Sequence, residues 1–226
     1  MKLRAPLGRL FERLERVFDR AFTPAHNPLH RLGALGWFFF WVVVASGVYL
    51  YIFFDTGITA AYRSVESLTH TQWYLGGVMR SLHRYASDAL VIVMLVHLAR
   101  EYAKDRYRGA RWFAWFTGVP MIWLVYVLGI SGYWLVWDEL AQYVAIGTSE
   151  WLDSLGIFGK SVARNFLDQD TLSNRFFTLM VFVHILVPLL LLFLMWIHIQ
   201  RNADAKVNPP RALAAGTPAA PPAVSF

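Results

Sequence analysis

The sequence of 226 residues contains no cysteine. Zinc sites built on thiolates, iron–sulfur clusters held by this chain and haem attached covalently through cysteine are therefore excluded. Charged residues are also scarce, at 16% of the chain, and they are sparse in four long apolar blocks. The net charge of +6 comes from basic residues that flank these blocks. That pattern indicates membrane topology and argues against a nucleic-acid partner.

What the sequence has in abundance is hydrophobic residues, which make up 57% of the chain and give a mean hydropathy of +0.40. A helix of about 20 apolar residues crosses the hydrocarbon core of a bilayer. Four segments meet this requirement, at about 32–54, 76–100, 112–137 and 174–199. We therefore predict an all-α fold, an integral membrane four-helix bundle.

The N-terminal segment has a different pattern, because residues 6–22 place apolar side chains at helical spacing with arginines on the other faces. This predicts an amphipathic helix on the membrane surface, and a soluble helix packed on a partner is the alternative. We predict a surface helix and linker at 1–31, a transmembrane domain at 32–201 and a disordered tail at 202–226. The first apolar run starts only after about 30 residues, which predicts a permanent span and not a signal peptide.

The loops differ in charge. Basic residues are concentrated before the first span, between the second and third spans, and after the fourth, whereas the loop before the second span and the long loop 138–173 carry few. Positive charge favours the cytoplasmic side, so we predict a multi-pass protein of the bacterial inner membrane with both termini cytoplasmic. A loop as long as 138–173 is expected to contain short helices on the outer surface.

Four histidines share one spacing. His83 and His97 in the second span, and His184 and His198 in the fourth, are each 14 residues apart. Fourteen residues are close to four helical turns, or roughly 21 Å, so each pair shares one helix face. Both spans run in the same direction, which puts His83 at the depth of His184 and His97 at the depth of His198. Two facing histidines can supply both axial ligands of a haem iron, so we predict two non-covalent b-type haems.

The other two spans repeat this period with glycines. Hydrogen bonding between helices explains one membrane histidine, but not two pairs at matched depth. Glycine at each depth would let a flat macrocycle approach the backbone, although close helix packing also favours small residues. The candidate residues are Gly33 and Gly47 in the first span and Gly118 and Gly132 in the third.

Two arginines complete the candidate site. Arg80 lies three residues before His83, and Arg100 lies three after His97. These are the ends of the second span, where guanidinium groups could pair with haem propionates, and snorkelling is the alternative explanation. Asp88 lies inside the span and is expected to pair with another helix or subunit. The remaining histidines lack matched partners and are expected at the surface: His26, His30 and His70.

These residues resemble the N-terminal, haem-bearing half of the cytochrome b family, which includes quinol:cytochrome c oxidoreductases and their chloroplast-type relatives. The resemblance runs from about Pro24 to Gln200. It includes Arg80-Ser-Leu-His83, His97 with Arg100, the paired glycines, Ser131-Gly132-Tyr133 with Trp137, and Thr171-Leu172 followed by Arg175-Phe176-Phe177, His184 and Pro188. It implies one haem between His83 and His184 at low potential and another between His97 and His198 at higher potential. The family's second half, with its Pro-Glu-Trp-Tyr motif, does not occur in the 226 residues.

The resemblance implies an electron-transfer subunit that links a quinone pool to other redox subunits, and it also suggests a dimer. Partners would supply the second cytochrome b half, or an iron–sulfur, multihaem cytochrome or molybdenum module. The alternative within electron transfer is a haem b membrane-anchor subunit of a dehydrogenase or reductase, without a bifurcating quinol-oxidation site. A transporter or a structural anchor would need polar pathway groups or broken helices, which the spans do not show apart from Asp88.

Overall fold

The structure of the chain, a computed structural model, describes residues 3–72, 74–157, 159, 161, 167 and 173–207. Side chains in this part are described except those of Ala110 and residues 202–207. The described residues form helices joined by turns and contain no β-strand, which confirms the predicted all-α fold. Most of the predicted tail, residues 208–226, lies outside the described residues.

Within the described residues, four helices are long and apolar enough to span a membrane, as the sequence predicts. Their membrane segments are 25 to 28 residues long, and the first segment includes the turn Pro28–Arg31 that precedes its helix. Since a helix rises about 1.5 Å per residue, each exceeds a hydrocarbon core of about 30 Å. The fourth membrane segment ends at Arg201, and its helix continues to Val207. The four helices are α2 (Leu32–Phe53), α4 (Gly76–Ala103), α5 (Trp112–Val136) and α8 (Asn174–Val207).

Local chemistry sets where two of the helices begin. Before α2, Asn27 accepts a hydrogen bond from the N–H of Leu29 at 2.9 Å and caps the short 3₁₀ turn η1 (Pro28–Arg31). After α5, Trp137 has a left-handed φ of 56°, and Asp138 then caps the next helix by accepting from an N–H at 2.7 Å. The chain therefore turns sharply from a span into a helix that lies across its end.

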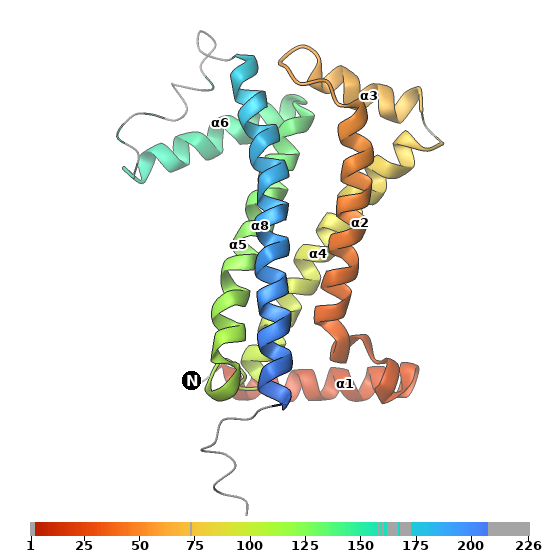
Figure 1. Cartoon of the computed structure of the whole chain (residues 1–226), viewed down its shortest axis with the longest axis vertical. Coiled ribbons are helices and arrows are strands. Elements are labelled where there is room, and N and C mark those ends of the chain that lie inside the picture. Colours follow the sequence, from red (N-terminus) through yellow and green to blue (C-terminus); the bar gives the residue numbers. More distant parts are fainter. Residues whose placement is uncertain are drawn as a thin grey trace, which may run out of the picture.

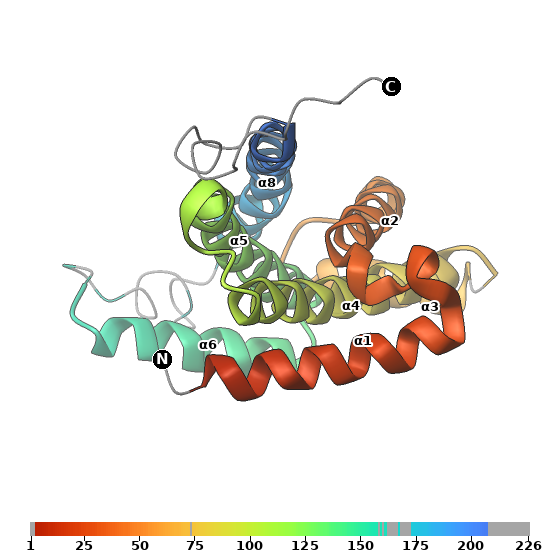
Figure 2. The ribbon, with the colours of Figure 1, turned by 90° about the horizontal axis from the view of Figure 1, so that it is seen from below.

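The spans pack as two antiparallel pairs, α2 along α4 and α5 along α8 (Figure 1). Helix α1 (Arg4–His26) crosses one end of the bundle, so the N-terminal helix expected over 6–22 is present, and a kink at Thr23, where φ is 65° and ψ is 155°, interrupts it just after that range. Helices α3 (Ala61–His70) and α6 (Glu139–Ser154) lie at the other end. The view from below shows α1 and α6 on the same side of α4, away from α2 (Figure 2).

Of the two helices at this end of the bundle, α6 lies in a segment where helices were expected and α3 was not predicted. Helix α3 was not predicted, although its buried residues Ala61, Val65 and Leu68 recur at helical spacing. Helices were expected in the loop 138–173, and α6 forms there as one 16-residue element. Most of the remainder of that loop lies outside the described residues.

An apolar layer crosses the middle of the bundle. It contains one buried residue from each span, and in each case that residue lies halfway along the chain between the two repeated glycines or histidines of its helix. The layer therefore fills the interior between the two histidine depths and keeps them apart. Its members are Phe40, Leu90, Val125 and Leu191.

Candidate functional site

His83 of α4 and His184 of α8 face each other inside the bundle. Their ring centroids are 6.3 Å apart, and the ring planes are inclined at 63°. If two imidazoles bound one metal ion from opposite sides, bonds of about 2.0 Å and ring radii of roughly 1.1 Å would put the centroids about 6.2 Å apart. The observed separation therefore fits two axial ligands of one iron. We call this pair and its surroundings the His83 level.

His97 of α4 and His198 of α8 form the second pair, which we call the His97 level. Both rings are partly buried, and they lie close enough to interact electrostatically. Fourteen residues of helix, or roughly 21 Å, separate the two levels along α4 and along α8. The His97 level is the one nearer to α1, because it lies close to the end of α4 that packs on α1.

The four candidate glycines each face one of the four histidines. A β-carbon built on Gly47 would lie 2.9 Å from Cε1 of His83, and one on Gly132 would lie 2.6 Å from Cε1 of His184. At the other level, the corresponding distances are 3.8 Å from Gly33 to His97 and 3.4 Å from Gly118 to His198. The glycines thus make room for the imidazoles, and the approach is closest at the His83 level.

Three of the imidazoles are held through Nδ1 by the helix opposite. Nδ1 of His83 lies 2.9 Å from the carbonyl oxygen of Val43 and 3.2 Å from the hydroxyl of Ser46. Ser131 lies 3.0 Å from Nδ1 of His184, which also bonds the Leu128 carbonyl. In the same way, His198 bonds Thr117 at 3.0 Å and the Ala114 carbonyl.

These contacts fix which nitrogen of the ring carries the proton. The Ser46 hydroxyl donates to the main-chain carbonyls of Val42 and Val43, at 2.7 and 3.1 Å, so its oxygen is free to accept. A carbonyl can only accept, and Nδ1–H is therefore the donor of each ring. This tautomer leaves Nε2 with its lone pair available for a metal.

The donor set fits haem better than a bare metal ion. Among the described residues, no group of three His, Asp or Glu side chains gathers in a way that could hold a metal. Protein sites for zinc use three or four protein ligands, whereas a haem iron needs only two axial ones. Two isolated histidine pairs therefore match the predicted cofactor. The three histidines expected at the surface are all exposed: His26, His30 and His70.

Both candidate arginines bond to carboxylates on the surface helices. Arg80 donates to Glu66 of α3 at 2.9 Å. The buried Arg100 donates to Glu15 of α1 at 2.8 Å, and Lys104 lies 2.7 Å from the same carboxylate. These contacts join α4 to the two helices that lie across its ends. The predicted contacts of the arginines with haem propionates stay a prediction.

The two carboxylates titrate below their ordinary range for different reasons. The hydrogen bond from Arg80 lowers the pKa of Glu66. Burial alone would raise the pKa of Glu15, but the hydrogen bonds from Lys104 and Arg100 together outweigh it and lower this pKa. Each carboxylate therefore stays ionised and paired near neutral pH.

Sequence reasoning missed both carboxylates and all three hydroxyls. The hydroxyls left a readable signal, because Ser or Thr directly precedes three of the four glycines, as Ser46-Gly47, Thr117-Gly118 and Ser131-Gly132. The fourth glycine, Gly33, follows Leu32, which has no hydroxyl to offer His97. For the carboxylates, no local pattern singles out one acidic residue as the partner.

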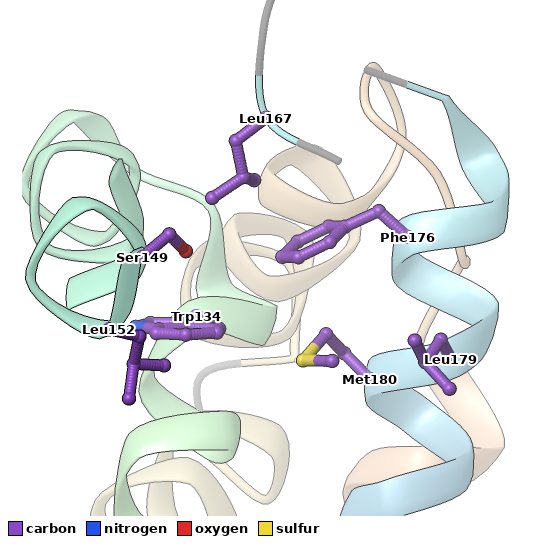
Figure 3. A pocket seen from close by; sticks show the side chains of 7 residues that line it. All are labelled: Trp134, Ser149, Leu152, Leu167, Phe176, Leu179 and Met180. Carbon is purple, nitrogen blue, oxygen red and sulfur yellow. The ribbon is translucent and has the colours of Figure 1, made fainter. Parts of the chain in front are cut away.

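An apolar cavity of about 150 Å³ lies between α5, α6 and α8 (Figure 3). None of the four paired histidines lines it, so it is separate from both levels. The buried indole N–H of Trp134 borders it and has no hydrogen-bond partner within the described part of the chain. The side chains that line the cavity are Trp134, Ser149, Leu152, Leu167, Phe176, Leu179 and Met180.

Comparison with known proteins decides the family. The family model described as "Cytochrome b/b6/petB" matches residues 17–202. The chain belongs to the cytochrome b/b6 family. This confirms the resemblance seen in the sequence, and with four apolar spans it makes the chain a multi-pass membrane b-type cytochrome of electron transfer, which binds haem b.

Two relatives place this cytochrome b/b6 chain within the family. Cytochrome b6 of Porphyra purpurea is 28% identical over 183 residues, covering 78% of this chain and 83% of that protein. A chain of "Hyperthermophilic respiratory Complex III" shares the fold with a TM-score of 0.70 at 20% identity. That match covers 85% of this chain but 52% of the other, so this chain spans about half the length of the complex III chain.

Proposed function

We propose that the chain is a di-haem b-type cytochrome subunit that transfers electrons across the membrane, between a quinone pool and partner redox subunits of a larger complex. The observation that carries the proposal is the repeated pair: two imidazoles face each other at 6.3 Å, and the same helices carry a second pair 14 residues further along. Haem b, when bound, supplies reversible one-electron chemistry at its iron.

The chain's own residues would hold the two haems in place. His83 and His184 would bind one iron through Nε2, and His97 and His198 would bind the other. The facing glycines leave the space that the imidazoles occupy. The hydrogen bonds to Nδ1 orient the rings and increase their basicity.

The surroundings of the two levels would control the electron transfer. The apolar layer formed by Phe40, Leu90, Val125 and Leu191 lowers the local dielectric between the levels, and burial of this kind tunes reduction potentials. Arg80 and Arg100 lie at opposite ends of α4, where they would also pair with propionates. The two levels, roughly 21 Å apart along the helices, together cover most of a hydrocarbon core of about 30 Å.

We further propose that both termini lie in the cytoplasm of a bacterial cell, with α1 on the inner membrane surface. Basic residues support this orientation, since they are concentrated in α1 and in the segment between α4 and α5. In this orientation the His83 level lies toward the outer face. Quinone and the partner subunits would exchange electrons with the chain at the two membrane faces.

A second candidate is the haem b membrane-anchor subunit of a dehydrogenase or reductase that lacks a bifurcating quinol-oxidation site. The four spans and the paired histidines would serve this function equally well. Purification with native partners separates the two candidates. A second cytochrome b half with an iron–sulfur protein would support the first, and a molybdenum or ferredoxin-like subunit would support the second.

The number of haems can be tested directly by pyridine haemochrome assay and redox titration of the purified complex. We expect about two non-covalent haems per chain, by analogy with bis-histidine cytochromes. His83→Ala should lose one haem and leave the other titratable. His70→Ala is the control, because His70 is 75% exposed and bonds Glu66 instead of another imidazole. Retention of both haems by His83→Ala would refute this ligand assignment.

A further inference from the structure

Helix α4 exposes two charged side chains inside its membrane span, Arg84 and Asp88. Asp88 follows His83 by five residues and precedes His97 by nine, so it lies between the two histidine levels. It is 12 residues from the start of α4 at Gly76, or about 18 Å along the helix. A carboxylate on so short a side chain cannot reach the membrane surface from there.

The charged residues belong to one continuous exposed strip of α4. Tyr85 is 66% exposed and Ile92 is 61% exposed, and both are spaced from Asp88 by three or four residues, as neighbours on a helix are. We call the strip formed by Ser81, Arg84, Tyr85, Asp88 and Ile92 the Asp88 face. Helices α2, α5 and α8 lie on one side of α4, whereas α1 and α6 lie on its other side, at opposite ends of the bundle (Figure 2).

The neighbouring residues do not neutralise Asp88. Within the part of the chain that the structure describes, no hydrogen bond or ion pair reaches its carboxylate. Arg84 lies over the ring of Tyr85, 5.9 Å from its centroid, and close enough to Tyr133 of α5 to interact with it electrostatically. Ionisable residues inside a membrane are costly, and they ordinarily face other protein or a water-filled cavity.

We propose that the Asp88 face binds a transmembrane helix of a different polypeptide, which presents a hydrogen-bond donor or a cation to Asp88 and an acceptor to Arg84. The proposal requires that the chain spans the membrane and does not depend on the number of haems. Charge complementarity at this depth is what would choose the partner, because an apolar helix would leave both charges unpaired.

A second copy of this chain fits the face poorly. Copies inserted in one membrane share one orientation, so a two-fold axis would run along the membrane normal. Residues near such an axis meet their own counterparts at the same depth. Asp88 would then face Asp88, and the nearest arginine of the other copy would lie four residues away, about 6 Å along the helix.

Photocrosslinking in native membranes tests the proposal on the intact complex. The probe is p-benzoylphenylalanine in place of Tyr85 on the Asp88 face. The matched control carries the same probe in place of Phe193 on α8, which is 55% exposed. We expect the probe at position 85, and not the probe at position 193, to give an adduct with one membrane-spanning polypeptide other than this chain, identified by mass spectrometry.

Substitution of the carboxylate then tests whether Asp88 selects that polypeptide. Asp88→Leu should reduce the adduct at least tenfold with the reduced haem α-band unchanged, and Asp88→Glu should restore it. An adduct between two copies of this chain, labelling of lipid alone, or an adduct that Asp88→Leu leaves unchanged would each overturn the proposal. If Asp88→Leu fails to insert, the position-85 adduct in the otherwise unaltered chain and the response of Asp88→Asn decide the outcome.

Discussion

At the His83 level, both imidazoles are bonded through Nδ1 to a hydroxyl and a carbonyl of the facing helix, and a β-carbon added to either facing glycine would lie within 3.0 Å of a ring. At the His97 level, only His198 has such a hydroxyl, and a β-carbon added to the facing glycines would lie 3.4 and 3.8 Å from the rings. The nearby ionic groups also differ: Arg100 and Glu15 are almost fully buried, whereas Arg80 and Glu66 are each 30% exposed.

The comparison shows that one repeated motif can be stabilised in two ways. The His83 level depends on close contact between each ring and the opposite backbone, which tolerates little added volume. The His97 level is more loosely packed around its rings, and beside it a buried ion-pair cluster fastens α1 to α4. Substitutions in the two levels should therefore have different effects even where the residue types match.

The largest difference between the two levels should be in haem content after a facing glycine is replaced by alanine. Gly132→Ala would put a β-carbon 2.6 Å from the ring of His184, which its hydrogen bonds hold in place, and we expect loss of one haem per chain. In Gly33→Ala the new β-carbon would lie 3.8 Å from the ring of His97, and this variant should keep both haems. Added volume in a packed interior typically costs about 1–3 kcal/mol. Haem content per chain by pyridine haemochrome checks both expectations.

Gly129→Ala is the control on the same helix, because a β-carbon there meets nothing within 4 Å. Full haem content in this variant would show that alanine in α5 is harmless in itself. If Gly132→Ala also kept both haems, the rings would not be fixed at the His83 level as described.

The next largest difference should be in the free-energy cost of replacing Glu15 and of replacing Glu66. Glu15→Gln removes the carboxylate that the buried Arg100 shares with Lys104 and leaves Arg100 only its longer 3.3 Å pair with Glu101, a loss that costs roughly 3 kcal/mol, at the low end for a buried pair. Glu66→Gln breaks a half-exposed pair, which is worth about 0.5 kcal/mol. Proteolysis between α1 and α2 measures how often α1 leaves α4, and proteolysis between α3 and α4 measures how often α3 leaves it. Relative to the unaltered chain, the Glu15 variant should be cut roughly a hundredfold faster at the first site, and the Glu66 variant only about twofold faster at the second. Equal acceleration of cleavage at the two sites would contradict the expected difference between the buried and the more exposed ion pair.

The same cluster predicts a pH dependence. Burial raises the pKa of Glu15, but the hydrogen bonds from Lys104 and Arg100 lower it by more, so the folded value lies below that of the unfolded chain. The stabilisation is therefore complete above the ordinary carboxyl pKa and is lost as the pH falls through the lowered value. Cleavage between α1 and α2 should accelerate on acidification below that ordinary pKa. Glu15→Gln, which cannot ionise, should show a flatter profile.

Much of this architecture could be predicted from the sequence, because its signals are local. Apolar length defines the four spans, and the 14-residue period puts His83 and His97 on one face of α4. The partner of Arg100 was not predictable in the same way, since Glu15 lies 85 residues away and α1 has several faces that could dock. Helix α3 was overlooked because its apolar residues fill only about two turns, and from that helix comes the carboxylate that bonds Arg80.

The smallest expected effect concerns the hydroxyls. Ser131→Ala removes one of two acceptors from Nδ1 of His184 and leaves the Leu128 carbonyl, so the ring should stay in place and haem content should not change. A net hydrogen bond is worth about 1 kcal/mol, and its loss makes the imidazole a weaker donor to iron. The midpoint potential of the haem at the His83 level should therefore rise slightly in a redox titration, while the other haem is unaffected.

Leu32→Thr would place a hydroxyl before Gly33, the position that lacks one, and should lower the potential at the His97 level only. A shift of both potentials in either variant would mean that the hydroxyls act on the whole bundle, not on a single ring.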